Sequence, residues 1–453
     1  MKAKSEKVLD RNMITGNPGK ALVFFALPLI LGNLFQQLYN IIDSIIVGNF
    51  VGSNALVAVG ASAAITFLFV ALATGMSIGS SVVISQFYGA KKYREMKIAI
   101  TTIIITMFCL SLILMIIGLL LNKSILRFMN TPEVIMEDAA VYLGIYFMGL
   151  TFLFMYNTFT AVFNALGDSK KPLYFLFLSS IINVVLDLWF VISFNMGVAG
   201  VAWATLIAQG ISAVISFVVL WRKLSKMELP KEIPAFSFHM LKQIFRVAIP
   251  STIQQSIVSL GMVFVQTLVN GFGETVVAGY TAATKIDSIT IMPMIAVGNA
   301  MSTFTAQNMG AGKSERIKKG YKTAFLMILA VSLTLTTVLF LMGDILVGAF
   351  VDTKTSQAVI DAGVDYLRVV SLFYILMGCM NITSGILRGA GDVRFYMACT
   401  MCNFATRVIL AYALVGIFKQ RAIWYAIPMG WLAGLVVARV RYRSGKWKEK
   451  RLI

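Results

Sequence analysis

Two aspartates stand inside long apolar stretches of this sequence, where an acidic side chain is costly. Asp43 lies within "QQLYNIIDSIIVG" and Asp187 within "IINVVLDLWFVIS". A carboxylate at the centre of a membrane span costs about 3 kcal/mol on insertion scales, and such groups usually mark ion or proton pathways. Because burial disfavours the charged form of an acid, a carboxyl group placed there can bind a proton and release it again. The two residues therefore predict reversible binding of a small cation.

Amides and hydroxyls recur at helical spacing beside both acids. Gln36 and Tyr39 precede Asp43 by seven and four residues, which places the three on one face of a helix. Asn183 precedes Asp187 by four residues and shares a face with it. The other polar candidates in these stretches are Asn157, Thr205 and Gln209, of which the last two share a face.

Either H⁺ or Na⁺ could be the bound cation. A proton needs only a carboxylate, whereas Na⁺ would require several oxygen ligands, which Asp187, Asn183 and Thr205 could supply. In both cases the cation competes with a positively charged substrate for the same negative charge. Such competition is what an antiporter needs, and no cofactor beyond the coupling ion is expected.

The elements that position these residues must be membrane helices. The 453 residues are 58% hydrophobic and 13% charged, with mean hydropathy +0.82, whereas a soluble domain is about a quarter charged. A spanning helix needs about 20 apolar residues, and the runs here are continuous rather than alternating as a membrane barrel requires. Twelve runs are long enough: 21–47, 55–86, 98–121, 139–164, 173–193, 198–221, 243–269, 276–306, 321–342, 362–387, 394–417 and 422–440.

The net charge is +19, and the positions of the basic residues along the chain indicate its membrane topology. Lysine and arginine gather at both ends of the chain and between alternate pairs of spans, as at 91–97 and 313–319, while "GNFVGSN" and "SFNMGVAG" hold none. This positive-inside pattern predicts a multi-pass protein of the cell (inner) membrane with both termini in the cytoplasm. We therefore expect membrane lipids, and no nucleic acid, opposite these charges.

The second half of the chain repeats the first. "VISQFYGAKKYREMKIA" corresponds to "FTAQNMGAGKSERIKKG", and Pro28 corresponds to Pro250. Each half holds six spans, so we expect an all-α membrane protein of two parallel six-helix bundles, related by a pseudo-twofold axis along the membrane normal. The predicted bundles are residues 1–221 and 243–453, joined by a cytoplasmic linker at 222–242, and they face a central cleft used for alternating access. The two prolines should kink their spans and act as hinges.

The repeat also explains a stretch that looks like a nucleotide site. Gly312-Lys313-Ser314 ends like a phosphate-binding loop, but Gln307 occupies the place of the first glycine of that motif. The corresponding loop of the first half reads "AKKYR", so both are basic turns. His239 is the sole histidine, and the four cysteines lack metal-site spacing. We expect neither an enzyme nor a metal site other than Na⁺.

The charge is not repeated between the halves. Val265 corresponds to Asp43 and Ala411 to Asp187, so the acids are confined to the first half, which favours a functional site there. In the second half, Lys285 and Asp287 could form an ion-pair lock or contact a substrate, and both alternatives are open. Arg407 is expected to pair with an acid of its own half.

The order of these motifs resembles the multidrug and toxic compound extrusion (MATE) family. The resemblance rests on "QFYGAKK", "QNMGAGK", "NALGDSKKP", "RGAGD" and "NVVLD", which recur in order along nearly the whole chain. "TKID" and the confinement of the acids are more similar to the DinF-like branch than to the NorM-like branch. The NorM-like branch has acids in spans 7 and 10, where this chain has Gln254 and Gln255 in span 7 and no deep acid in span 10.

The resemblance implies export of organic, often cationic, compounds driven by inward H⁺ or Na⁺ flow. By position it assigns cation coupling to Asp43, Asn183, Asp187 and Thr205. The residues expected to line the cleft or bind substrate are Gln36, Tyr39, Asn157, Gln209, Gln254, Gln255, Lys285 and Asp287. We expect a monomer whose partners are drugs or other small organic cations. The alternative is a flippase for lipid-linked or amphipathic precursors, which would need several cationic side chains in the cleft.

Overall fold

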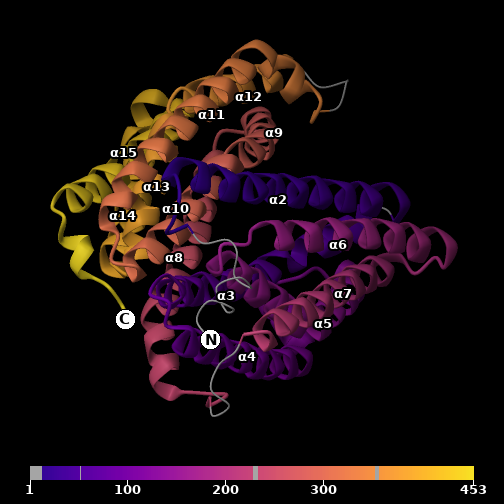
Figure 1. The fold of residues 1–453 in the computed structure, drawn as a ribbon. Helices are drawn as coiled ribbons and strands as arrows, with labels where there is room; N and C mark the ends of the chain where they lie inside the picture. The colour runs from indigo at the N-terminus through magenta and orange to yellow at the C-terminus, as the bar shows by residue number, and fades with distance from the viewer. Residues whose placement is uncertain (1–12, 52, 228–232, 352–356) are drawn as a thin grey trace. The chain divides into compact units, whose positions relative to one another are not determined.

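The computed structural model describes residues 13–51, 53–227, 233–351 and 357–453, and the regular structure in these ranges is helical. The α-helices are α2 (Pro18–Ile46), α3 (Ser53–Gly89), α4 (Tyr93–Phe128), α5 (Glu133–Ala165), α6 (Lys170–Leu188), α7 (Gly197–Ser225), α8 (Phe238–Asn270), α9 (Glu274–Thr290), α10 (Met292–Gly310), α11 (Ser314–Gly348), α12 (Gln357–Ser371), α13 (Tyr374–Ala390), α14 (Val393–Phe418) and α15 (Arg421–Arg443) (Figure 1). Two π-helical turns, η1 (Val47–Val51) and η2 (Trp189–Ser193), follow α2 and α6, and a 3-10 turn, η3 (Lys446–Glu449), follows α15.

The helices agree with the predicted spans. In the described ranges, 11 helices are long and apolar enough to cross a membrane, with Glu274–Gly310 acting as one span. Helices α12 and α13 pass the same test together and are bent by 50° at the break between them, which brings the number to 12 if the pair is one span. The prediction of an all-α membrane protein is confirmed.

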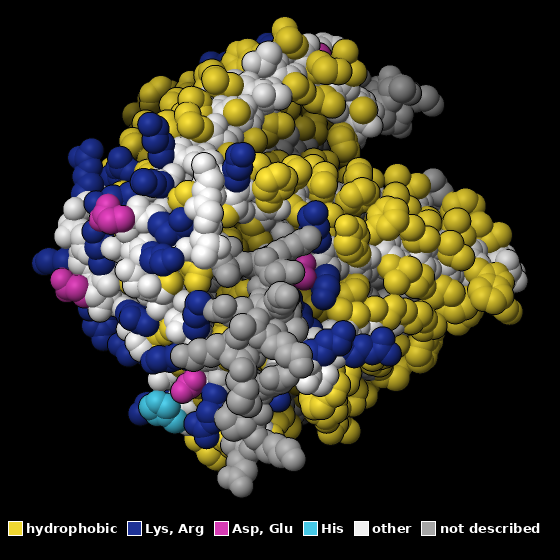
Figure 2. Space-filling view, in the orientation of Figure 1, with side chains coloured by type: hydrophobic (Ala, Val, Ile, Leu, Met, Phe, Trp, Pro, Cys, Tyr) yellow, Lys and Arg dark blue, Asp and Glu magenta, His cyan; other side chains and the backbone are white. Residues whose placement is uncertain are grey.

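The surface is that of a protein surrounded by lipid. Large apolar side chains stand out from the helices, including Leu120, Leu341 and Ile417, which are 78%, 77% and 73% exposed. Figure 2 shows hydrophobic side chains over broad areas, while Lys and Arg gather in clusters on the face in view. Monomeric soluble proteins rarely expose apolar areas of this extent, so these exposed apolar side chains face lipid.

The chain forms two compact units. Among the described residues, unit 1 comprises Leu31–Thr252, and unit 2 comprises Met13–Ile30 and Ile253–Ile453. The first part of α2 therefore belongs with the second half of the chain, and the first part of α8 belongs with the first half. A division at the linker would assign both segments to the other bundle. Residues 228–232 of that predicted linker lie outside the described ranges.

Each exchanged segment ends beside a proline. Helix α2 contains Pro28 and passes from unit 2 to unit 1 after Ile30, and helix α8 contains Pro250 and passes from unit 1 to unit 2 after Thr252. A proline inside a helix removes one backbone hydrogen bond and loosens the helix at that turn. The two predicted hinge prolines thus stand where their helices change unit, and bending at them stays a prediction.

The loop that looked like part of a nucleotide site binds residues 13–16, the segment before α2, within unit 2. The guanidinium of Arg316 donates to the backbone oxygens of Gly16, Thr15 and Met13 at 2.8, 3.0 and 3.2 Å. Lys313 donates to the backbone oxygen of Ile14 at 3.0 Å. Lys313 and Arg316 therefore bind peptide carbonyls and anchor the segment that leads into α2.

Small residues let helices approach closely inside unit 1. Gly75 and Gly79 of α3 face the first part of α8, and a Cβ added at Gly79 would lie 2.2 Å from the Cα of Ala248. This G-x-x-x-G spacing puts both glycines on one helix face, and small residues of this kind drive helix association in lipid. The exchanged segment of α8 is thereby packed backbone to backbone on α3.

We expect Gly79→Ala to destabilise the protein by about 1–3 kcal/mol, because the added methyl group would overlap backbone atoms that cannot rotate away. Gly416→Ala is the matched control, since nothing lies within 4 Å of a Cβ at that position in α14. Thermal unfolding of the two purified variants should show a lower Tm for Gly79→Ala only. Equal Tm values would contradict the close approach of α3 and α8.

Unit 2 uses the same device between α10 and α13. A Cβ at Gly385 would lie 2.5 Å from the backbone oxygen of Gly298, and one at Gly389 would lie 2.2 Å from the backbone oxygen of Ser302. A buried aromatic cluster supports the other end of the unit, where the rings of Tyr280 and Trp424 stack with centroids 5.5 Å apart. These contacts join α10 to α13 and α9 to α15.

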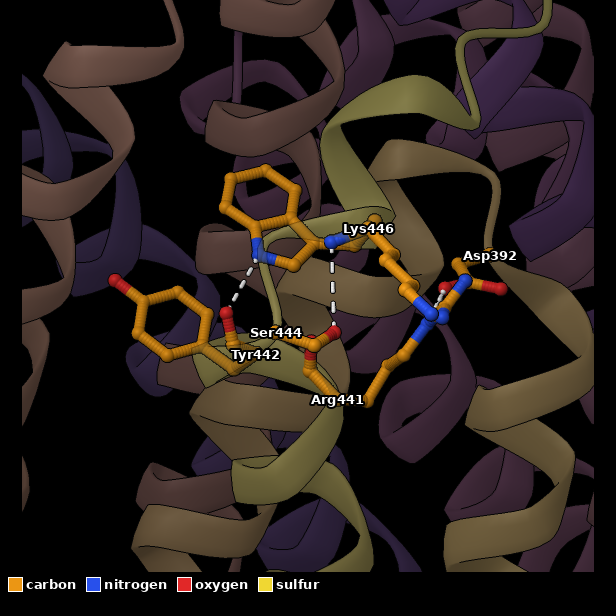
Figure 3. A network of polar contacts seen from close by, with 6 residues as sticks. Asp392, Arg441, Tyr442, Ser444 and Lys446 are labelled. Atoms are coloured by element: carbon orange, nitrogen blue, oxygen red, sulfur yellow. Dashed lines mark hydrogen bonds and ion pairs between the residues drawn. The ribbon is translucent and has the colours of Figure 1, made fainter.

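The two Gly-Asp motifs of the repeat tie the last helix of each half in place. Asp392, between α13 and α14, accepts from Nε of Arg441 in α15 at 2.6 Å, and both side chains are buried. Figure 3 shows this pair beside the turn that begins at Ser444. In the first half, Asp168 is 3.7 Å from Nζ of Lys223 in α7. The repeated acid thus has the same structural task in both units.

Candidate functional site

Helix α6 supplies two buried members of the candidate cation site in unit 1. Asp187 is fully buried and Asn183 is 1% exposed. With its nitrogen turned toward Asp187, the Asn183 amide donates to Oδ2 of Asp187 at 2.7 Å. Its oxygen then accepts from the backbone nitrogen and the hydroxyl of Thr205 in α7 at 3.1 and 3.3 Å. The opposite orientation would set two acceptor oxygens against each other, so this arrangement holds the Asp187 carboxyl in a fixed position.

Helix α2 brings the second acid to the first. The side chain of Asp43 lies close enough to that of Asp187 for the two carboxyl groups to interact directly, and the hydroxyl of Tyr39, one turn earlier, interacts with the side chain of Thr205. Two carboxyl groups can share a hydrogen bond only if one of them carries a proton, and otherwise they repel. The pair therefore requires a proton or another cation to be neutralised.

Each of the two acids has one carboxylate oxygen that is available to bind such a cation. Oδ1 of Asp43 and Oδ1 of Asp187 are both buried without a hydrogen-bond partner among the described residues. A buried acceptor without a partner is unfavourable by about 1–3 kcal/mol, and by more when it is charged. The site thus offers two unsatisfied carboxylate oxygens next to the amide of Asn183 and the hydroxyl of Thr205.

The helix geometry beside both acids is unusual. Asp43 is followed within four residues by η1, and Asp187 within two residues by η2. Single π-helical turns inside helices are rare and frequently occur at functional sites, because they release backbone groups from the regular ladder. The two π-helical turns therefore lie directly after the two acids that the sequence analysis selected as cation-binding candidates.

The remaining candidates of unit 1 lie at varied depth. Gln36 is exposed, while Gln209 is half-buried. Asn157 is half-buried and donates to the backbone oxygen of Leu153 in its own helix at 2.9 Å. One residue that the sequence analysis did not select is Tyr142 of α5, which interacts electrostatically with both Asp43 and Asp187. The sequence shows only that Tyr142 is a tyrosine inside a predicted span, and nothing in the local pattern distinguishes it from the other tyrosines.

Of the two alternatives for Lys285 and Asp287, the ion-pair lock does not occur in the described part of unit 2, and the substrate contact stays a prediction. Oδ1 of Asp287 accepts from the hydroxyl of Tyr374 at 2.6 Å and Oδ2 from that of Tyr366 at 3.2 Å. Lys285 is exposed and lies two residues away, on a different face of α9. Arg407 acts on the Asp287 carboxyl group electrostatically, but no ion pair joins the two among the described residues, so the pairing of Arg407 with an acid of its own half stays a prediction.

Gln254 belongs to a network around a buried arginine in unit 2. Arg388 donates to Ser302 at 3.0 Å, to Asn299 at 2.7 Å and to the hydroxyl of Tyr396 at 3.2 Å. That hydroxyl donates in turn to Oε1 of Gln254 at 2.5 Å. Gln255, half-buried, also has a polar partner. The two glutamines therefore lie in helix α8 near fixed polar groups, and no carboxylate of the described residues is bonded to Arg388.

The positions that correspond to the two acids are apolar and packed in unit 2. Val265 and Ala411 are each 1% exposed. Neither can bind a cation, and both contribute to the hydrophobic core of their unit. The two repeats therefore differ at these positions. Unit 1 has a pair of acids with unsatisfied oxygens, and unit 2 has closely packed apolar side chains.

Comparison with known proteins gives a consistent result. The family model MatE matches residues 28–189 and 250–413, which are the two repeats. The probable multidrug resistance proteins YpnP and YoeA of Bacillus subtilis (strain 168) are 31% and 26% identical to the chain. The YpnP alignment covers 96% of this chain and 97% of YpnP, and the YoeA alignment covers 100% and 99%.

Solved structures share the fold over almost the full length. A MATE family transporter of the MOP superfamily in an outward-facing conformation superposes with a TM-score of 0.90 at 25% identity, covering 98% of this chain and 99% of the other. A MATE structure in a bent conformation gives 0.88, and one in a straight conformation gives 0.86, both at 25% identity. Each covers 98% of this chain, and 98% and 99% of the respective structure.

Proposed function

Because this chain belongs to the MatE family, it is a multi-pass membrane transporter and not an enzyme, and we propose that it exports organic, often cationic, compounds in exchange for H⁺ or Na⁺. The family gives the class of multidrug efflux transporter. The coupling ion and the exchange mode are part of the proposal, as is the assignment to the DinF-like branch.

One observation carries the exchange mechanism. The carboxyl groups of Asp43 and Asp187 lie together, and each has a buried oxygen without a hydrogen-bond partner among the described residues. A cation bound there removes the repulsion and satisfies both oxygens. When the cation leaves, the site regains a negative charge that a cationic substrate can neutralise. Cation and substrate thus compete for one charge, and this links their movements in opposite directions.

The exchanged segments supply a route for motion. Pro28 and Pro250 stand where α2 and α8 change unit, so bending there would move the part of α2 that carries Asp43 against the anchored start of the helix. The same fold has been observed in bent, straight and outward-facing conformations. We propose that cation binding at the acid pair favours one conformation and substrate binding the other.

The proposed orientation places both termini in the cytoplasm and the chain in the cell membrane, where it acts as a monomer. The positive-inside distribution of lysine and arginine supports this orientation. The basic turn at 313–319 and the basic end of α15 would then lie on the cytoplasmic side. The flippase alternative finds no support among the relatives, which are multidrug resistance proteins.

Transport in everted membrane vesicles tests the proposal. Vesicles that contain the full chain are loaded with acid or with Na⁺, and uptake of ethidium from the outside is followed by fluorescence. We expect ethidium to accumulate when the gradient of the coupling ion, H⁺ or Na⁺, is imposed, and to be released when an ionophore collapses that gradient. Accumulation that ignores both gradients, or that equals the uptake of vesicles without the protein, would contradict the exchange mechanism.

A further inference from the structure

Unit 2 contains a groove that has no part in the proposed exchange site. It is a cavity of about 350 Å³ lined by Tyr321, Lys322, Phe325, Cys379, Leu435 and Arg439, which come from α11, α13 and α15. Helix α13 forms the floor, since it packs against both α11 and α15. The walls are mainly apolar, and two cations stand among them.

The groove lies near one end of its helices. Tyr321 is seven residues into α11, and Arg439 is four residues before the end of α15, which corresponds to depths of about 10 and 6 Å. This is the end of unit 2 where Arg316, Lys318 and Arg443 gather. Lipid headgroups and the first part of their acyl chains occupy this depth in a bilayer.

The charge of Arg439 is held in place by neutral groups. Its Nη1 donates to the hydroxyl of Tyr321 at 2.7 Å, and its guanidinium lies 5.3 and 5.6 Å from the ring centroids of Tyr321 and Tyr442. The Tyr321 hydroxyl is fixed further by Thr383 at 3.1 Å. By contrast Arg441, two residues along, is bonded to a carboxylate. The positive charge of Arg439 is thus positioned but not neutralised by these contacts.

Exposed apolar side chains stand next to the lining residues in both α11 and α15. Leu326 beside it in α11, and Val436 and Val440 beside it in α15, are exposed apolar side chains. Lys322, also exposed, carries a flexible amine that can reach the membrane boundary. An occupant of this groove therefore meets an apolar surface along its length and positive charge at one end.

We propose that this groove binds an anionic phospholipid, whose phosphate is held by Lys322 and Arg439 and whose acyl chain lies along Phe325, Leu435 and Cys379. Basic pockets between membrane helices recognise anionic headgroups through this combination of charge and depth. Arginine suits a phosphate because its guanidinium can donate two parallel hydrogen bonds. The proposal does not rest on the transport activity.

Lipid binding to the purified full-length chain tests this site. Dioleoylphosphatidylglycerol and dioleoylphosphatidylcholine are titrated separately, and bound lipid is counted by native mass spectrometry. The variant Lys322→Gln/Arg439→Gln removes two charges in the groove, and Lys318→Gln/Arg443→Gln removes two charges at the same end outside it. We expect phosphatidylglycerol affinity to fall about 10- to 30-fold in the groove variant and to stay near wild type in the control.

A third variant keeps the test decisive if the groove variant folds poorly. Leu435→Trp fills the apolar part without changing charge, and it should also weaken phosphatidylglycerol binding. The proposal is overturned if Leu435→Trp binds this lipid as wild type does, if the control loses as much affinity as the groove variant, or if phosphatidylcholine binds wild type equally well.

Discussion

Replacing Asp187 by asparagine is expected to abolish efflux driven by an ion gradient. Asparagine has nearly the same shape and keeps an oxygen for the Asn183 amide, which lies 2.7 Å from Oδ2 of Asp187. It cannot carry the negative charge that a proton or Na⁺ must neutralise. The variant should therefore fold normally and bind no coupling ion, and its uptake of ethidium in everted vesicles should fall to that of vesicles without the protein.

Asp43→Asn should give the same result, because the two carboxyl groups form one site. Asp344→Asn provides the control, since it removes an acid that pairs with Arg368 at the exposed surface of unit 2. Gradient-driven uptake by Asp344→Asn should equal that of wild type. Full uptake by Asp187→Asn, at normal expression, would remove Asp187 from the mechanism.

A hydroxyl replacement distinguishes the two coupling ions. Thr205→Val keeps the shape of the side chain and removes the oxygen that lies 3.3 Å from the Asn183 amide. A proton needs only the carboxylates, so H⁺-driven uptake should persist in this variant. Na⁺ needs further oxygens, so Na⁺-driven uptake should require a higher Na⁺ concentration for the same rate. The response of Thr205→Val thus reports which ion the site uses.

Replacing Asp392 by asparagine is expected to have the largest effect on stability. Arg441 is 9% exposed and Asp392 4% exposed, and their Nε and Oδ2 atoms are 2.6 Å apart. Removing one partner of a buried pair leaves an uncompensated charge, which usually costs about 3–5 kcal/mol. The cation also lies over the ring of Phe395, with its centroid 4.2 Å away, and cannot move to water without disrupting that packing.

The free energy of unfolding in lipid nanodiscs is the measurement, with Asp344→Asn as the control again. Its pair with Arg368 is exposed on both sides, and pairs of this kind contribute about 0–1 kcal/mol. The double variant Asp392→Asn/Arg441→Met should recover much of the loss, because no buried charge remains. A small change in Asp392→Asn alone would show that Arg441 finds another partner.

Features that depend only on residues within one helix could be predicted from the sequence. Apolar runs of about 20 residues gave the spans, and the spacing of Asn183 and Asp187 put both on one face of α6, where the structure has them. The repeat located the asymmetry, since Val265 and Ala411 are buried and apolar where the first half has acids. The same periodicity argues against the pairing of Lys285 with Asp287, because residues two apart point to different sides of a helix.

Contacts between distant segments required the three-dimensional structure. Tyr142, Tyr366 and Tyr374 reach the buried acids from other helices, and nothing in their local sequence marks them. The anchoring of Met13–Gly16 by Arg316 spans about 300 residues of chain. The groove of Lys322 and Arg439 likewise arises only because α11 and α15 both pack on α13.

The amino-acid order thus specifies the membrane class, the duplicated helices and the half that carries the Asp43–Asp187 pair, because hydrophobicity, period and repeat are properties of contiguous residues. The exchange of the first parts of α2 and α8 between units, and the two carboxylate oxygens left without partners, follow from how closely helix backbones approach. That approach depends on small residues such as Gly79 meeting Ala248 across 169 positions of sequence. Helical period carries no information about which faces will meet.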